Sequence, residues 1–360
     1  MSLLLEEREE ALEASLWEAL HAGYVVGLKN GYKFLHDRVQ EAAYTVVPKE
    51  DRPSMHLRIG GILLSSMTPD EVCEKILDVV NQLNLGAALV TGWNEKEQIA
   101  ELNLRAGRTA KASAAYASAC TDFSVAMALL GTEGWSRCYE LAFSVYLERA
   151  ECEFLSGNFS EAERLIEKLL GQVAPKIDKA AVYRVKIDLH VVKSEMALAV
   201  NSCLDCLSLL GVEMSAHPSG TEVHAEYEKV WKNLDGRSIE SLIELPPITN
   251  AEMQAAMRTL SLLFVPAVLT DNNLLYLHLC KMVNLSVQYG TTDAAVAAYA
   301  WFGIILGPVF HRYEDGYLFG RLACDLVDKF GFAAYRRIFF YDLTREPLQC
   351  LLRSHFVFHL

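Results

Sequence analysis

The sequence predicts a mainly α-helical protein, in which a small N-terminal winged-helix domain precedes a solenoid of helical hairpins. After residue 68, apolar and small residues recur at intervals of three and four, as at Ala106, Ala110 and Ala114, which places them on one helical face. Glycine, asparagine and proline interrupt this pattern often enough to indicate helices of about 12–20 residues joined by short loops. Sustained alternation with a period of two is nearly absent beyond the N-terminal region, where two short β-prone runs flank an Asn-Gly pair.

Residues 1–67 have the order of elements of a winged helix. A polar helix from Glu6 to Ala22 leads into two β-prone runs, and the Asn30-Gly31 pair between them is a strong short-range signal for a hairpin. A second helix is expected from Asp37 to Tyr44 and a third from Ser54 to Ser66, with a proline-containing break between them. Helices that lead into a two-stranded wing predict a winged-helix domain.

Residues 68–345 are predicted to form an irregular solenoid of tetratricopeptide-like (TPR-like) hairpins. The clearest repeat is Gly157-Asn158-Phe159 followed by Ala162, in which the glycine permits a turn, the phenylalanine fills the helix pair and the alanine allows close approach. The corresponding alanine upstream lies 43 residues earlier, an interval longer than the ~34 residues of standard repeats. The expected repeat anchors are Tyr116, Ala119, Gly157, Phe159, Ala162, Tyr313 and Gly316.

The end of the chain departs from this pattern. Residues 346–360 are largely apolar and lack the polar capping helix that a solenoid needs for solubility. We therefore expect an atypical, truncated tail.

The composition favours a globular cytoplasmic protein. Hydrophobic residues make up 52% of the 360 positions and charged residues 22%, which excludes an intrinsically disordered chain. Lys and Arg number 33 against 46 Asp and Glu, so the formal charge of −13 argues against nucleic acid and against anionic membranes as partners. No apolar run reaches the ~18 residues that span a bilayer, and the N-terminus lacks the basic region of a signal peptide. The nine scattered cysteines fit reduced, buried thiols better than a disulfide framework.

Two local patterns resemble functional motifs, but each fits a structural role better. The run from Gly23 to Asn30 has three residues rather than four between its glycines, and it lacks the hydroxyl that binds magnesium in a phosphate-binding loop. Cys203 and Cys206 have the Cys-x-x-Cys spacing, but no second pair of zinc ligands follows and no strand precedes them. We expect two buried thiols on one helical face, and no metal, cofactor or catalytic residue in the chain.

An adjacent imidazole and carboxylate at His36 and Asp37 could in principle perform general base chemistry. Neighbouring side chains on an extended segment point to opposite faces, however, and no nucleophile or metal motif accompanies them. The structural alternative is that Asp37 caps the following helix, with Glu41 near its first turn, while His36 forms a hydrogen bond across the domain.

The segment from Tyr32 to Tyr44, Tyr-Lys-Phe-Leu-His-Asp-Arg-Val-Gln-Glu-Ala-Ala-Tyr, resembles a motif of bacterial STAND-type signal-transduction ATPases and sensor kinases. In that family the motif follows the nucleotide-binding domain. The resemblance extends from about residue 16 to residue 331. Its further matching segments are 52–60, 78–87, 100–107, 148–155 and 282–286.

The resemblance implies a large cytoplasmic parent polypeptide. Its domains would be a serine/threonine-kinase-like domain, an AAA-like ATPase domain, this winged-helix and repeat region, a sensing domain and a C-terminal histidine kinase. The chain corresponds to the region between the ATPase and sensing domains, and it lacks the family's phosphate-binding loop and phosphoacceptor histidine. The resemblance implies interdomain roles for His36, Asp37, Arg38, Gln40, Tyr44 and His56.

The hypothesis that follows is a non-catalytic regulatory module. The resemblance implies that the upstream ATPase domain and the kinase domains are its partners, and the concave repeat surface would bind a partner protein or peptide. One alternative is an enzyme, either through the ATP-binding and histidine kinase activity of the parent or through an unrecognised site in the repeats. Another is a DNA-binding winged helix, for which the expected recognition helix 37–44, with one arginine, one aspartate and one glutamate, is electrostatically weak.

Overall fold

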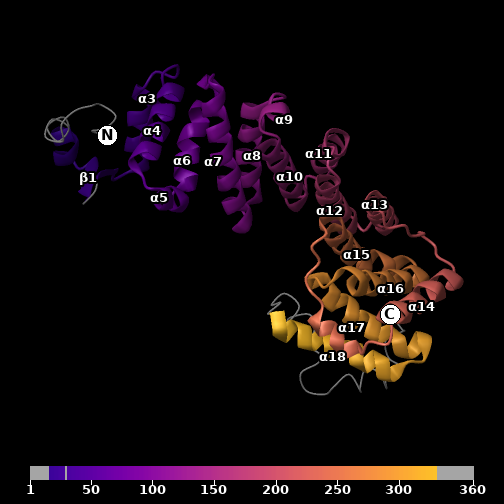
Figure 1. The fold of residues 1–360 in the computed structure, drawn as a ribbon. Helices are drawn as coiled ribbons and strands as arrows, with labels where there is room; N and C mark the ends of the chain where they lie inside the picture. The colour runs from indigo at the N-terminus through magenta and orange to yellow at the C-terminus, as the bar shows by residue number, and fades with distance from the viewer. Residues whose placement is uncertain (1–15, 29–30, 331–360) are drawn as a thin grey trace. The chain divides into compact units, whose positions relative to one another are not determined.

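The computed structural model describes residues 16–28 and 31–330 and shows a mainly helical protein, as the sequence predicts (Figure 1). The chain divides into two compact units, Met1–Leu165 and Ile166–Leu360. The domain boundary predicted between residues 67 and 68 falls within the first unit, just after a helix, and stays a prediction. Asn30 and the tail at 346–360 lie outside the described residues.

In the first unit, a helical stretch at 16–21 leads into two antiparallel strands, and helices make up most of the rest. The elements are β1 (Val25–Leu28), β2 (Gly31–Phe34), α3 (Asp37–Val46), α4 (Arg52–Ser66), α5 (Pro69–Glu74), α6 (Ile76–Gly86), the 3-10 helix η1 (Ala87–Leu89), α7 (Trp93–Ala112), α8 (Tyr116–Leu130), α9 (Gly134–Arg137), α10 (Tyr139–Leu155) and the first part of α11 (Phe159–Gln172).

The predicted hairpin is present, with Val25 paired to Phe34 and Gly27 to Tyr32. Helix α3 begins at Asp37 as expected, but the capping role predicted for Asp37 is wrong. The extended residue that precedes the helix is His36, with φ −135° and ψ 136°, and its side chain forms no capping hydrogen bond. Asp37 instead lies in the first turn, where its negative charge interacts favourably with the positive end of the helix dipole.

Two apolar clusters hold the first unit together. The first joins α5, α6 and α7 and includes partly buried leucines of α4; the second joins α7, α8 and α10. Burial of these side chains supplies most of the stabilisation, because removing apolar surface from water is the dominant favourable term in folding. Their central members are Val79, Val80, Leu83 and Ile99 in the first cluster and Ala100, Phe123, Ala126 and Val145 in the second.

Small residues set the distance between neighbouring helices of this unit. A Cβ added at Gly60 of α4 would lie 2.4 Å from Leu83 Cδ2 of α6, and one at Gly107 of α7 would lie 2.4 Å from Phe123 Cε1 of α8. Both distances are too short for any side chain. The two helix pairs therefore approach so closely that only glycine fits at the contact.

The second unit is a continuous set of helices packed on one core. Its elements, after the end of α11, are α12 (Lys176–Val192), α13 (Met196–Leu209), α14 (Gly220–Leu234), the 3-10 helix η2 (Ile239–Glu244), α15 (Ala251–Thr270), α16 (Asn272–Tyr289), α17 (Asp293–Phe310) and α18 (Tyr313–Phe330). One apolar cluster extends from α12 to α18, and Tyr299, Phe302 and Phe319 are among its largest fully buried side chains.

The backbones of α17 and α18 approach each other closely in this unit. A Cβ at Gly303 would lie 2.6 Å from the carbonyl oxygen of Gly316, and a Cβ at Gly316 would lie 2.6 Å from the carbonyl oxygen of Gly303. Gly316, one of the predicted repeat anchors, therefore meets a second glycine across the helix pair.

Three turns of three residues each, between successive helices, share one geometry, which also occurs at Gly23 and at Gly211. Ala114, Gly157 and Ser194 each have a positive φ, at 58°, 82° and 60°. In each turn the residue after it donates its N–H to a carbonyl five positions earlier, from Ala115 to Ala110, from Asn158 to Glu153 and from Glu195 to His190. These are Schellman motifs, which satisfy the last carbonyl groups of the preceding helix.

Within the described part of the second unit, two helices are long and apolar enough to cross a membrane, judged by length and composition alone. They are α15 and α17, and 44% and 61% of their most apolar windows are buried inside the protein. Core helices of soluble proteins have the same property, so this observation is weak evidence for a membrane.

Two adjacent glycines test the close approach of α4 and α6. Gly60→Ala should lower the free energy of unfolding by about 1–3 kcal/mol, because its Cβ would overlap Leu83. Gly61→Ala should raise it by up to about 1 kcal/mol, because no atom lies within 4 Å of its Cβ and alanine favours a helix. Urea denaturation of the two variants measures both effects, and changes of the same sign would contradict the packing described.

Candidate interaction site

The predicted motif residues at the start of α3 lie on the surface. His36, Asp37, Arg38 and Gln40 are exposed, and no residue of α3 is buried. No hydrogen bond or ion pair joins these four side chains to another side chain within residues 16–28 and 31–330. The structure therefore places them where another molecule can reach them, and it does not bring His36 and Asp37 together with a nucleophile.

Two other motif residues, Tyr44 and His56, lie within hydrogen-bond distance of each other, and Gln82 binds the second ring nitrogen of His56. The Tyr44 hydroxyl lies 3.0 Å from His56 Nε2, and Gln82 Oε1 lies 2.7 Å from His56 Nδ1. Because the amide oxygen only accepts, Nδ1 carries the proton and Nε2 accepts from the tyrosine hydroxyl. The buried imidazole thus connects α3 to α4 and α6.

Arg52 strengthens the attachment of α3. Its guanidinium lies 4.5 Å from the centre of the Tyr44 ring, and its Nε donates a hydrogen bond of 3.0 Å to the carbonyl oxygen of Val47. A cation over an aromatic face is attracted by the negative charge of that face. The end of α3 is therefore fixed to the start of α4.

The hairpin presents an apolar outer face. Side chains alternate along β1, so Val25 is buried while Tyr24 and Val26 point the other way and are 53% and 40% exposed. Leu28 and Leu35 continue this face and are 59% and 52% exposed. Lys33 pairs with Val26, so its exposed side chain lies on the same face as the four apolar ones. Exposed apolar side chains grouped on one face mark sites of protein interaction more often than single exposed residues do. We call these four residues the hairpin face.

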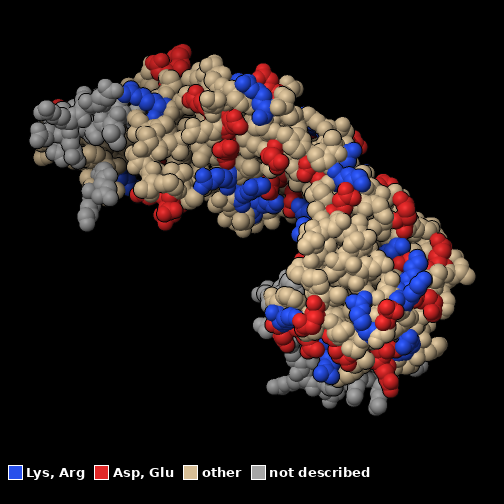
Figure 2. Space-filling view, viewed as in Figure 1, with Lys and Arg blue, Asp and Glu red and all other residues tan. Residues whose placement is uncertain are grey.

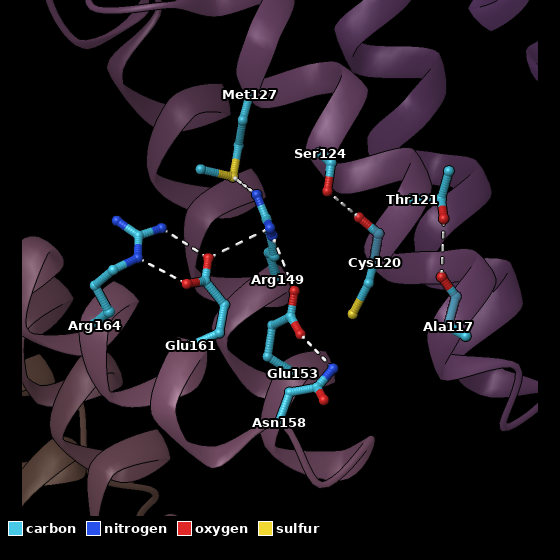
Figure 3. A network of polar contacts seen from close by, with 10 residues as sticks. All are labelled: Ala117, Cys120, Thr121, Ser124, Met127, Arg149, Glu153, Asn158, Glu161 and Arg164. Atoms are coloured by element: carbon cyan, nitrogen blue, oxygen red, sulfur yellow. Dashed lines mark hydrogen bonds and ion pairs between the residues drawn. The ribbon is translucent and has the colours of Figure 1, made fainter.

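A polar network around Arg149 secures the turn between α10 and α11 (Figure 3). Arg149 Nε donates to Glu153 Oε1 at 3.2 Å, and Nη2 donates to Glu161 Oε1 at 3.4 Å. Asn158, in the turn itself, donates to Glu153 Oε2 at 2.9 Å. The guanidinium also lies 3.3 Å from the sulfur of Met127 in α8.

The same network shifts the ionisation of Glu161. Two hydrogen bonds of 2.7 Å from the Arg164 guanidinium, with a further contribution from Arg149, hold the pKa of this carboxyl below its usual range. Figure 3 shows the two arginines on either side of the carboxylate. Arg149 therefore lies at the centre of a polar network that joins α8, α10, the turn and α11.

A ladder of amides crosses three helices of the first unit. Asn84 of α6 and Asn103 of α7 exchange hydrogen bonds of 2.8 and 2.9 Å, and Asn84 Nδ2 also lies 3.5 Å from Asp122 Oδ1 of α8. Burial raises the pKa of Asp122 to about 6. The carboxylate is thus held in an environment that favours its neutral form.

A comparable network fixes α14 to α16 in the second unit. The buried carboxylate of Glu226 accepts from Lys281 and Lys229 at 3.1 and 3.0 Å and from the Asn284 amide at 2.8 Å. Burial alone would raise the pKa of Glu226, but these charged and polar partners lower it. Asn233 completes the network by donating to Asn284 Oδ1 at 2.8 Å.

The cysteine pair lies where the sequence predicts. Cys203 and Cys206 are buried in α13, and burial raises the pKa of both thiols. Among the described residues, no group of three His, Cys, Asp or Glu side chains is placed to hold a metal ion. Cys73 departs from the expected burial, because it is exposed and accepts a hydrogen bond from Arg105.

Acidic and basic side chains are mixed on the visible surface of each unit rather than separated into fields of one sign (Figure 2). An example within the first unit is the group formed by Arg108 and Lys111 of α7 with Glu148 of α10, at 2.7 and 2.8 Å. Compensated charges of this kind do not by themselves attract a charged partner over long distances.

The repeat anchors occupy equivalent places in their helices. Tyr116 and Phe159 begin the helices that follow two of the three Schellman turns, and Ala119 and Ala162 are fully buried three residues later. The third turn has the same arrangement, with Met196 at the helix start and Ala199 fully buried. The sequence pattern missed this third case because a serine replaces the glycine and a methionine the aromatic residue.

No family model matches the chain. The hybrid signal transduction histidine kinase G of Dictyostelium discoideum is 24% identical to it over 341 residues. The matched region covers 83% of this chain and 10% of the relative, so the chain spans about a tenth of the length of the protein it matches. This distant similarity supports a relation to signal-transduction proteins.

Loss of the central arginine of the turn network should destabilise the first unit. Arg149→Leu is expected to lower the free energy of unfolding by about 2–4 kcal/mol, because it removes the cation beside Glu153, whose side chain is 8% exposed. Arg164→Leu is the control, with an expected cost of at most about 1 kcal/mol because that side chain is 57% exposed. Chemical denaturation compares them, and equal losses would contradict a central role for Arg149.

Asp122 should make the first unit less stable at neutral pH than in mild acid. Its folded pKa of about 6 exceeds the ordinary 3.8, so the folded state takes up the proton first and stability rises as the pH falls through 6 towards 3.8. Asp122→Asn should therefore raise the free energy of unfolding at pH 7.5 by about 1–3 kcal/mol and remove this dependence. Denaturation at pH 7.5 and 5 measures both effects. A variant less stable than the parent at pH 7.5 would exclude this origin.

Proposed function

We propose that this chain is a non-catalytic regulatory and protein-interaction module of a larger cytoplasmic signal-transduction protein. In this proposal the N-terminal elements form a winged-helix domain and the remaining helices form an irregular TPR-like solenoid. The larger protein would be an ATPase of the STAND type or a sensor kinase, and it would supply the ATP-binding and kinase activities. The similarity to a hybrid histidine kinase, of which the chain matches a tenth, is consistent with such a parent.

The hairpin face carries the proposal. Four large apolar side chains of one small hairpin are between 40% and 59% exposed, and α3 beside them buries none of its residues. A two-stranded hairpin with an exposed apolar face is marginal in water on its own. The face gains stability if a neighbouring domain covers it, and the upstream nucleotide-binding domain is the proposed occupant.

The exposed motif residues would form the polar rim of this contact. His36, Arg38 and Gln40 lie at the start of α3, directly after Leu35 of the hairpin face. Interfaces combine an apolar centre with a hydrogen-bonding rim, and these exposed polar side chains would supply such a rim. His36 is the residue we propose for direct contact with the nucleotide-binding domain.

The hydrogen bonds that join Tyr44, His56 and Gln82 would transmit a displacement of α3 on docking to the helices that follow. A displacement of α3 cannot leave His56 unaffected, because Tyr44 bonds one of its ring nitrogens and Gln82 of α6 bonds the other. The repeated helix pairs beyond α6 would bind a partner protein or peptide, or hold the kinase domains inactive until a signal arrives. Recurrent turns at Ala114, Gly157 and Ser194 support the repeat assignment.

DNA binding by α3 is the less favoured alternative. Its exposed face carries Asp37 and Glu41 beside the single basic residue Arg38. A helix that enters the major groove must approach phosphates on both sides, which favours a basic surface.

Binding to the preceding domain tests the docking proposal. Isothermal titration calorimetry of this chain with the nucleotide-binding domain, in its ATP-bound and ADP-bound forms, should detect a complex in at least one form. Leu28→Glu should weaken it by about tenfold or more, because the substitution places a negative charge within the hairpin face.

Leu77→Glu is the matched control for that experiment. Leu77 lies on α6, is 48% exposed and is not part of the hairpin face, so its substitution should leave the affinity unchanged. No binding in either nucleotide state, or equal weakening by both substitutions, would contradict docking through the hairpin face.

A further inference from the structure

His278 is a buried ionisable side chain without a partner. It lies in α16, its side chain is fully buried, and neither ring nitrogen has a hydrogen-bond partner within the described part of the chain. The ring of Phe264 from α15 packs edge-on against the imidazole, with 6.0 Å between the ring centres. The Phe264 ring also packs against Trp301 of α17, with 4.6 Å between their centres. A buried polar ring with no partner costs stability, so its presence in this core requires an explanation.

Among the described residues, no charged side chain influences the ionisation of the His278 ring. The charged side chains of α15 are Glu252 in its first turn and Arg258, which is exposed. In α17 the only charged residue is Asp293 at its first position, and the Tyr299 hydroxyl is bonded to Ser286 at 2.7 Å.

The third neighbour, α14, faces α16 with Glu226. Its carboxylate is occupied by Lys229, Lys281 and Asn284. On α16 itself, the titratable groups nearest along the chain are Tyr276, whose pKa is raised by burial, and the buried thiol of Cys280. None of these groups compensates a positive charge on His278.

The imidazole is therefore held in its neutral form. Burial lowers the pKa of His278 from 6.5 to about 4. The carbonyl groups of Leu275 and Leu274 favour the protonated ring, but without a hydrogen bond of normal geometry they do not offset the burial. Protonation becomes favourable only when water or another polar group reaches the ring.

We propose that His278 makes the second unit an acid-sensitive element, in which protonation of the ring is coupled to separation of α15 from α16. The second half of α15 is the segment that must move. It carries the Phe264 contact, and Pro266 within it cannot donate the helical hydrogen bond to the carbonyl of Leu262.

The direction and size of the pH effect on opening follow from the pKa of His278 in the open and closed forms. The open form binds a proton with the ordinary pKa of 6.5 and the closed form with a pKa of about 4, so acidification favours opening. Between pH 7 and pH 5 the opening equilibrium constant should rise about twentyfold. Carboxylates with lowered pKa values, such as Glu226, stay ionised in this range and do not produce the effect.

Hydrogen exchange of the whole chain measures this opening helix by helix. After correction for the intrinsic exchange rate, peptides within 251–289 should lose protection between pH 7 and pH 5 by about twentyfold. Peptides from α7 and α8 of the first unit are the internal reference and should not lose protection. In His278→Phe, which keeps an aromatic ring but cannot be protonated, the loss in 251–289 should disappear.

His224→Gln is the matched control, because His224 lies in the same unit with its side chain 67% exposed, and this variant should respond to acid like the parent. His278→Gln serves as a second non-titrating variant if the phenylalanine does not fold. The proposal is overturned if the parent shows no loss of protection, or if a folded His278 variant responds to acid as the parent does.

Discussion

Close approach between neighbouring helices is the constraint on which the rest of this structure depends. At Gly60, Gly107 and Gly303, a single added carbon would overlap an atom of the neighbouring helix. Helices held this near to one another bring their polar side chains within hydrogen-bond distance across the contact. The His56–Gln82 bond between α4 and α6, the two helices that meet at Gly60, is one result.

The sequence predicted the helical class, the hairpin and the clearest turn, because each depends on local chemistry. Gly157 was recognisable since glycine readily adopts the positive φ that the turn requires. The equivalent turn at Ser194 was missed, because there a serine adopts the same conformation at a local cost that the surrounding helices offset. A pattern of residue types does not reveal such a substitution.

The polar networks could not be derived from the sequence, because they depend on which helices become neighbours. A family resemblance points to His56, but its partner Gln82 lies 26 positions away and comes from a different helix. Arg149 and Glu153 lie one turn apart and are predictable as a pair, whereas the contacts of Arg149 with Met127 and Glu161 are not. The missing partner of His278 has no signal in the sequence at all.

Protonation of a partly or fully buried side chain has opposite effects on the stability of the two units. In the first, Asp122 favours the folded state in mild acid, whereas in the second, His278 opposes it. The hairpin face is separate from both and is where we propose that signals enter.

The most direct test of that claim compares hydrogen exchange of residues 23–46 in this chain alone and in the longer polypeptide that carries the nucleotide-binding domain. Docking predicts slower exchange in the longer polypeptide, and equal exchange in the two would contradict it.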